Sequence, residues 1–172
     1  MLIFLIGFMG SGKTTLGRPL AHRLGYGFVD LDKMIEEKAE ATVSEIFAAR
    51  GEEGFRVLER ACLEEVIAGG GDVVVSTGGG TPCFYDNMKA MNAGGVTVYL
   101  KLAPAALAAR LAGAKTCRPL VAGKSPEELV RYISETLAVR EAYYGEANVV
   151  VANPSRDVGR LIEILNPYLS HS

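Results

Sequence analysis

The chain has 172 residues, of which 49% are apolar and 22% are charged, as is typical of one globular domain. Its 18 basic and 20 acidic side chains give a net charge of −2, which argues against a nucleic-acid binder because such proteins carry a basic excess. The three cysteines, Cys62, Cys83 and Cys117, have no C-x-x-C spacing and indicate neither a disulfide framework nor a zinc site. No apolar run approaches the ~20 residues of a membrane span, and Met1–Phe8 reads as a strand rather than a signal peptide. We therefore expect a cytoplasmic protein without a membrane partner.

Short apolar segments alternate with segments of helical periodicity along the chain. The expected strands are Leu2–Ile6, Gly27–Asp30, Val73–Ser76, Val96–Leu100 and Asn148–Ala152. The expected helices are Lys13–Leu24, Glu52–Ala68, Phe84–Ala93, Pro104–Ala112, Pro126–Tyr144 and Ser155–Leu169. This alternation predicts an α/β protein with a parallel sheet covered by helices on both faces. Residues 31–69 hold more helix than one crossover needs, and residues 113–124, rich in Gly, Lys and Arg, are expected to form a loop.

Residues 7–14 read G-F-M-G-S-G-K-T and fit the P-loop pattern G-x-x-x-x-G-K-[ST] at every fixed position. The glycines let the backbone aim N–H groups at phosphate oxygens, and the helix that follows adds its positive end. In this pattern Lys13 reaches the β- and γ-phosphates, and Thr14 offers its hydroxyl to Mg²⁺. We therefore expect ATP with Mg²⁺, bound by Gly10, Ser11, Gly12, Lys13, Thr14 and Thr15.

The motif leaves the class of enzyme open, and other features narrow it. A Ras-like GTPase would carry a guanine-reading N-K-x-D, which does not occur here. The third strand leads into Thr77 and the glycines Gly78–Gly80, whereas an acidic pair, Asp30 and Asp32, follows the second strand. Because ligands in parallel α/β folds gather at the carboxyl ends of strands, these segments and the P-loop should face one cleft.

These residues, in this order, resemble the shikimate kinase family of P-loop enzymes. The matching segments are residues 7–21, 28–32, 45–59, 76–82, 118–120 and 140–144, which together span nearly the whole chain. The resemblance implies a three-layer α/β/α P-loop fold whose five-stranded parallel sheet has the order 2-3-1-4-5. It also implies one domain, residues 1–172, with a substrate-binding insertion at about 31–61 and a lid at about 113–124. The implied reaction is transfer of phosphate from MgATP to the 3-hydroxyl of shikimate, giving shikimate 3-phosphate and ADP, in the pathway to chorismate and the aromatic amino acids.

The resemblance also implies roles for the acidic pair. It places Asp30 on the Mg²⁺ side, and Asp32 at the attacking hydroxyl, where it would orient the group or accept its proton. On a continuing strand the two side chains would face the same side. An alternative is that Asp32 merely caps the next helix.

Two arginines, Arg56 and Arg140, are implied to clamp the substrate carboxylate, because a guanidinium binds a carboxylate through two parallel hydrogen bonds. The backbone N–H groups of Gly78, Gly79 and Gly80 would approach the same substrate. The alternative for both arginines is a surface residue in an ordinary helical pair, for example Arg56 with Glu52, Glu53 or Glu59. Glu59 is also placed to hold the Arg56 guanidinium from behind.

The remaining assignments concern the lid and the base of the nucleotide. Arg118 would reach the transferring phosphoryl group when the lid closes, although a solvated loop arginine is the alternative. Arg110 and Pro154 would stack on the adenine faces. Phe47 and Phe55 would pack against the substrate ring or belong to the core.

Other classes stay open on the sequence. A gluconate kinase would show an acidic element with a following histidine, but the only histidines are His22 and His171. A nucleoside monophosphate kinase, a regulator that has lost catalysis and an ATPase subunit are further alternatives. We expect a monomeric kinase of a small molecule, and shikimate-dependent release of ADP would separate it from the other classes.

Overall fold

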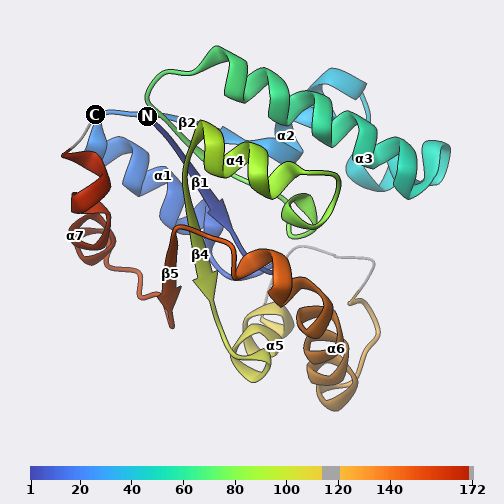
Figure 1. Ribbon diagram of the computed structural model, residues 1–172. Coiled ribbons are helices and arrows are strands. Elements are labelled where there is room, and N and C mark those ends of the chain that lie inside the picture. The colour runs from blue at the N-terminus through green and yellow to red at the C-terminus, as the bar shows by residue number, and fades with distance from the viewer. Residues whose placement is uncertain (114–120, 171–172) are drawn as a thin grey trace.

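In the computed structural model, described over residues 1–113 and 121–170, five parallel strands form one sheet in the order β2-β3-β1-β4-β5 (Figure 1). The strands are β1 (Leu2–Ile6), β2 (Gly27–Asp30), β3 (Val73–Ser76), β4 (Gly95–Lys101) and β5 (Val149–Ala152). Residues Leu2 to Ile6 of the central strand β1 are all buried, as expected for a strand covered on both faces. The predicted fold class and strand order are thus confirmed.

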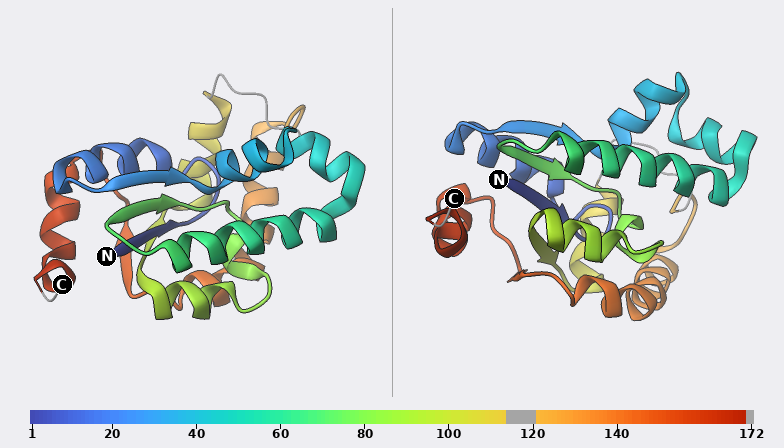
Figure 2. Two further views of the ribbon diagram at one scale, coloured as in Figure 1. Left: turned by 90° about the horizontal axis from the view of Figure 1, so that it is seen from above. Right: turned by 45° about the horizontal axis from the view of Figure 1, so that its top comes forward.

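Helices cover both faces of this sheet. They are α1 (Lys13–Leu24), α2 (Leu31–Ala39), α3 (Val43–Gly69), α4 (Asn87–Gly94), α5 (Pro104–Ala112), α6 (Pro126–Tyr144) and α7 (Val158–Leu169), with a short 3₁₀ turn at Thr81–Cys83. Side chains of β1 alternate between two cores. Ile3 and Leu5 pack with α1 and α7, whereas Phe4 and Ile6 pack with α2 to α6. Figure 2 shows the two layers of helices on opposite sides of the strands.

The predicted boundaries agree closely where the apolar pattern is continuous. The expected strands Leu2–Ile6, Gly27–Asp30 and Val73–Ser76 and the helices Lys13–Leu24, Pro104–Ala112 and Pro126–Tyr144 have the observed bounds. The fourth strand is one residue longer at each end, and the fifth begins at Val149 instead of Asn148. The Asn148 side chain is engaged with Thr97 on the neighbouring strand.

Side-chain caps explain two helix starts that were predicted wrongly. The helix expected from Glu52 begins at Val43, because Thr42 and Glu45 form a capping box. Gly51 interrupts it with non-helical backbone at φ 69°, so the start predicted at Glu52 marks its second part, and the first part belongs to the extra helix expected within residues 31–69. The helix expected from Ser155 begins at Val158, because Asp157 accepts hydrogen bonds from the backbone N–H of two following residues.

The helix expected from Phe84 begins at Asn87, after the 3₁₀ turn. Residues 31–61 form α2 and the first part of α3, which extend past the carboxyl ends of the strands (Figures 1 and 2). Within the described residues, no helix has both the length and the apolar character that crossing a membrane would require.

Candidate active site

The P-loop connects β1 to α1 and places its phosphate-binding groups at the carboxyl edge of the sheet. Gly12 caps α1 with φ 99°, a left-handed conformation that favours glycine. Lys13 Nζ donates to the carbonyl oxygens of Gly7, at 2.6 Å, and Phe8, at 3.0 Å. The buried Ser11 hydroxyl has no hydrogen-bond partner among the described residues. A loop with an unsatisfied hydroxyl and an ammonium group beside a helix start fits an anionic ligand such as a triphosphate.

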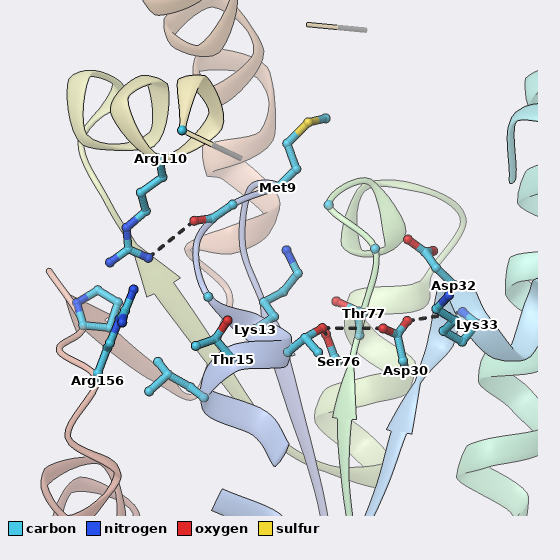
Figure 3. A pocket seen from close by; sticks show the side chains of 18 of the residues that line it. Met9, Lys13, Thr15, Asp30, Asp32, Lys33, Ser76, Thr77, Arg110 and Arg156 are labelled. Atoms are coloured by element: carbon cyan, nitrogen blue, oxygen red, sulfur yellow. Dashed lines mark hydrogen bonds between the residues drawn. The ribbon is translucent and has the colours of Figure 1, made fainter. Parts of the chain in front are cut away.

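A cavity of about 640 Å³ opens beside this loop (Figure 3). Its walls come from five parts of the chain: the P-loop and start of α1, the start of α2, the segment after β3, the end of α5 and the segment after β5. The predicted residues that line it are Gly10, Gly12, Lys13, Thr14, Thr15, Asp30, Asp32, Gly78, Gly79, Arg110 and Pro154. The predicted cleft at the carboxyl ends of the strands is therefore present.

Asp30 and Asp32 both line this cavity, but they belong to different elements and not to one continuous strand. The strand does not continue through Asp32, because β2 ends at Asp30 and α2 begins at the next residue. Asp30, rather than Asp32, caps α2, since Asp30 Oδ1 accepts from Lys33 N at 3.2 Å. Asp30 Oδ2 also lies 3.5 Å from the Thr14 hydroxyl, which in turn lies 3.3 Å from Ser76 Oγ. Thr14 and Asp30 thus form an oxygen-rich pair that suits a hard cation such as Mg²⁺.

Asp32 occupies the first turn of α2 and is held in an unusual electrostatic environment. Burial raises the pKa of its carboxyl to about 6, and the nearby carboxylates of Glu59 and Asp30 add to the rise, while Lys13 opposes it. A carboxylate with a pKa near neutrality is suited to accept a proton. Among the described residues, no group of three or more His, Cys, Asp or Glu side chains is placed to bind a metal. A cation here would need oxygen ligands from the nucleotide as well.

The three glycines after β3 each lie against one of the predicted substrate residues. A Cβ on Gly78 would come within 3.0 Å of Asp32 Oδ1, and a Cβ on Gly79 within 3.0 Å of Arg140 Nη1. A Cβ on Gly80 would come within 2.5 Å of Arg56 Nη2. Real Cβ atoms essentially never come closer than 3.0 Å to another heavy atom, so a Cβ on Gly80 would force a shift, whereas a Cβ on Gly78 or Gly79 would make a tight contact. Glycine at these positions therefore allows a carboxylate and two guanidinium groups to converge on one short loop.

Arg56 is almost fully buried, with 9% of its surface exposed, and is held on several sides. Nη1 donates to Glu59 Oε1 at 2.9 Å, and Nη2 lies 3.6 Å from Glu52. The guanidinium also lies over the Phe84 ring, 4.0 Å from its centre. The helical pairs of Arg56 with Glu52 and Glu59 therefore exist, and the same guanidinium lies against Gly80. Arg56 Nε is buried without a hydrogen-bond partner in the described part of the chain.

Glu59 holds Arg56 from behind, as predicted. Its side chain is 1% exposed, and its second oxygen accepts a hydrogen bond from the Thr81 hydroxyl at 2.8 Å. Thr81 begins the 3₁₀ turn directly after the glycines. Glu59 thereby connects the arginine to the loop against which it packs.

Arg140 approaches the same loop from α6. Its guanidinium lies 5.6 Å from the centre of the Phe8 ring, and Nη1 lies 3.5 Å from the Tyr144 hydroxyl. Tyr144 and Thr81 were not singled out in the sequence. Tyr144 stands in the matching segment 140–144, and its helical spacing of four residues from Arg140 was the available signal.

At the other end of the cavity, Arg110 Nη1 donates to the carbonyl oxygens of Gly10, at 3.4 Å, and Ser11, at 3.3 Å (Figure 3). Pro154 is buried and lines the same end. Arg156 also lines it and was missed, because a single arginine after a strand carries no motif. Arg118 lies outside the described residues, as does most of the predicted lid.

The two predicted aromatic residues divide between core and surface. Phe47 and Phe55 stack with their ring centres 4.6 Å apart. Phe55 is buried in the core, whereas Phe47 is 36% exposed. Only Phe47 therefore presents an accessible ring face.

The sheet order, the P-loop between β1 and α1, and the carboxylates and arginines around the cavity together define a small P-loop kinase. A family model described as shikimate kinase matches residues 9–165. The chain belongs to the shikimate kinase family, whose enzymes use ATP, so the predicted resemblance is confirmed.

Curated relatives and solved structures agree with this membership. The shikimate kinase of Phocaeicola vulgatus is 56% identical over 145 residues, covering 84% of this chain and 82% of the relative. That of Azobacteroides pseudotrichonymphae is 45% identical and covers 96% and 97%. The crystal structure of shikimate kinase from Bacteroides thetaiotaomicron has a TM-score of 0.91 at 44% identity, covering 99% of this chain and 98% of that one. Shikimate kinase from Acinetobacter baumannii in complex with shikimate has a TM-score of 0.84 at 35% identity, covering 99% and 94%.

Proposed function

We propose that the protein transfers the γ-phosphoryl group of ATP to the 3-hydroxyl of shikimate, giving shikimate 3-phosphate and ADP. This reaction lies in the shikimate pathway to chorismate and the aromatic amino acids. The observation that carries the proposal is the convergence of Asp32, Arg56 and Arg140 on the glycines Gly78–Gly80, beside the P-loop. Shikimate offers a carboxylate for the arginines and a ring hydroxyl for the aspartate.

The nucleotide end binds the triphosphate chiefly through the backbone. The N–H groups of Gly10, Ser11 and Gly12 and the positive end of α1 suit the phosphate oxygens. Lys13 exchanges the carbonyl oxygens of its own loop for phosphate oxygens. Thr14 and Asp30 would hold Mg²⁺, which when bound offsets negative charge on the transferring group. Arg110 and Pro154 would flank the adenine.

The acceptor end orients the hydroxyl that attacks. Arg56 and Arg140 bind the shikimate carboxylate and fix the ring, so that the 3-hydroxyl lies in line with the γ-phosphorus. Asp32 accepts the hydroxyl proton as the new O–P bond forms. Its pKa of about 6 leaves it mostly ionised at neutral pH and able to take that proton. Glu59 holds Arg56 in the required orientation through a 2.9 Å hydrogen bond.

The insertion at 31–61 and the lid at 113–124 complete the proposal. The insertion carries Asp32, Arg56 and the exposed ring of Phe47, whereas Gly78–Gly80 and Arg140 contribute from outside it. Arg118, in the lid, would reach the transferring phosphoryl group, and closure would exclude water from the reaction. We further propose a cytoplasmic monomer, in keeping with the free thiols of Cys62 and Cys83.

The test is a coupled assay of ADP release from MgATP with shikimate, gluconate or nucleoside monophosphates as the acceptor. We expect stimulation by shikimate alone. Stimulation by another acceptor would keep the kinase class and overturn the assignment of the two arginines. Hydrolysis of ATP that is indifferent to every acceptor would overturn the proposed function as a whole.

A further inference from the structure

The hydroxyl of Tyr144 lies between two parts of the proposed acceptor end. It donates a hydrogen bond to the carbonyl oxygen of Gly79 at 2.5 Å. A phenol has one hydrogen to donate, so toward Arg140 the same oxygen acts as an acceptor. Arg140 Nη1 donates to it at 3.5 Å. One oxygen atom thus joins the loop after β3 to the guanidinium on α6.

The Tyr144 ring is fixed as firmly as its hydroxyl. The side chain is 0% exposed and packs against the ring of Tyr99, with the ring centres 4.9 Å apart. The Tyr99 hydroxyl in turn donates to Glu141 Oε1 at 2.7 Å, which ties this aromatic pair to α6. Burial raises the pKa of Tyr144 to about 12, so its hydroxyl keeps its proton at neutral pH. The hydroxyl is therefore a permanent donor in a rigid setting.

We infer that Tyr144 is a positioning residue, which sets the distance between Arg140 and the Gly78–Gly80 loop through its hydroxyl. The inference rests on the proposed function, in which Arg140 binds the substrate carboxylate. Without the hydroxyl, the Gly79 carbonyl loses a buried donor and Arg140 Nη1 loses an acceptor. Because Nη1 lies only 3.0 Å from the point where a Gly79 Cβ would stand, a small shift of either group changes the space for the carboxylate.

The neighbouring tyrosine provides a matched control. Tyr143 is 37% exposed, and its hydroxyl makes no hydrogen bond to any residue in the described part of the chain. We would measure shikimate binding by calorimetry, and KM for both substrates, in Tyr144→Phe and Tyr143→Phe. We expect Tyr144→Phe to raise Kd and KM for shikimate by about 10-fold with KM for ATP unchanged. Tyr143→Phe should leave all of these constants at their wild-type values.

A ligand without the carboxylate separates positioning from a structural role. Reduced shikimate, in which a hydroxymethyl group replaces the carboxylate, does not use the arginine clamp. The wild type and Tyr144→Phe should therefore bind it within about 2-fold of each other. In an Arg140→Ala background, Tyr144→Phe should have no further effect on the Kd for shikimate.

Equal losses of affinity for the two ligands would overturn the inference. A fall in melting temperature with a rise in KM for ATP would also overturn it, because the hydroxyl would then hold the fold. If Tyr144→Phe binds shikimate as tightly as Tyr143→Phe does, the inference is overturned and the proposed function stands. Failure of the unaltered protein to bind shikimate would overturn the proposed function, and the inference with it.

Discussion

The proposed nucleotide end of the cavity comes largely from one stretch of chain, residues 7–15. The proposed acceptor end lies beside it and is assembled from α2, α3, the loop after β3 and α6, with Arg56 and Arg140 behind the residues that line the cavity. The first end offers backbone N–H groups and one lysine. The second offers side chains that are held by other side chains, as Arg56 is held by Glu59 and Phe84. The phosphate-binding groups thus come from one local turn of the backbone, whereas the proposed acceptor site depends on contacts between side chains that are distant in the sequence. Substitutions at the two ends should therefore separate in their kinetic effects.

The largest effect should come from Asp32→Asn, which removes the proposed proton acceptor. We expect kcat to fall by about 10²- to 10⁴-fold with KM for ATP little changed, measured by the coupled assay. Glu37→Gln, an exposed substitution on the same helix, should leave kcat unchanged. An Asp32→Asn enzyme with near-normal kcat would show that the carboxylate does not take the proton.

The same substitution should stabilise the fold. Folding raises the pKa of Asp32 from 3.8 to about 6, so folding favours its protonated form. The cost of keeping it ionised is absent below about pH 4 and fully present above about pH 6. Asp32→Asn removes this cost, and at about pH 7 we expect the free energy of unfolding to rise by roughly 1 to 3 kcal/mol. Denaturant unfolding at about pH 4 should show little of this gain.

Gly80→Ala should damage the acceptor end selectively. Its Cβ would stand 2.5 Å from Arg56 Nη2, so the guanidinium must move. We expect KM for shikimate to rise by about 10- to 100-fold, with KM for ATP within about 2-fold of the wild type. Gly69→Ala, where a Cβ meets nothing within 4 Å, is the matched control and should be neutral. Equal rises of both KM values would show that the two ends are not independent.

The pH dependence of kcat should reflect the titration of Asp32 at the acceptor end and not a change at the nucleotide end. Because the proposed proton acceptor is the ionised form of Asp32, kcat should be constant above its pKa of about 6 and fall as the pH drops below it. We expect a loss of about 10-fold at one pH unit below that value. The terminal phosphate of ADP titrates in the same range, so binding of ADP should show the same pH dependence by calorimetry in the wild type and in Asp32→Asn. A difference between the two proteins in ADP binding near this pH would contradict the separation of the two ends.

The smallest effect should come from Arg110→Ala at the nucleotide end. Among the described residues, Arg110 makes only long hydrogen bonds, of 3.3 and 3.4 Å, to the P-loop, so its loss should remove the proposed contacts with the adenine and little else. We expect KM for ATP to rise by about 3- to 10-fold with KM for shikimate unchanged. Arg131→Ala, at an exposed position on α6, serves as the control. A rise in KM for shikimate alone would assign Arg110 to the other end.

The contrast between the two ends also explains what the sequence could predict. The strands, their order and the P-loop follow from local patterns and a family resemblance, and these predictions were confirmed. The helix start at Val43 was missed because Gly51 breaks the apolar period. The capping role of Asp30 was also missed, because Asp30 and Asp32 are both of the residue type that favours a cap and the sequence does not show which of them precedes the first turn of α2.

Contacts between distant segments were the hardest to predict. The sequence shows Gly78–Gly80 as a run of small residues, but only the fold shows that each glycine faces a different charged side chain. The hydrogen bond from Tyr144 to the Gly79 carbonyl likewise joins residues that are 65 positions apart along the chain. Such pairings are set by packing across the sheet, which local periodicity does not encode.

The close packing of charged side chains against the Gly78–Gly80 loop has a consequence for inhibitor resistance. Resistance usually arises when a protein adds or enlarges a side chain that blocks the drug. Here any side chain would press against Asp32, Arg140 or Arg56, the groups proposed to hold the substrate. A compound that rests on this loop would therefore face few escape substitutions that the enzyme itself could survive, unlike a compound that rests on the exposed ring of Phe47.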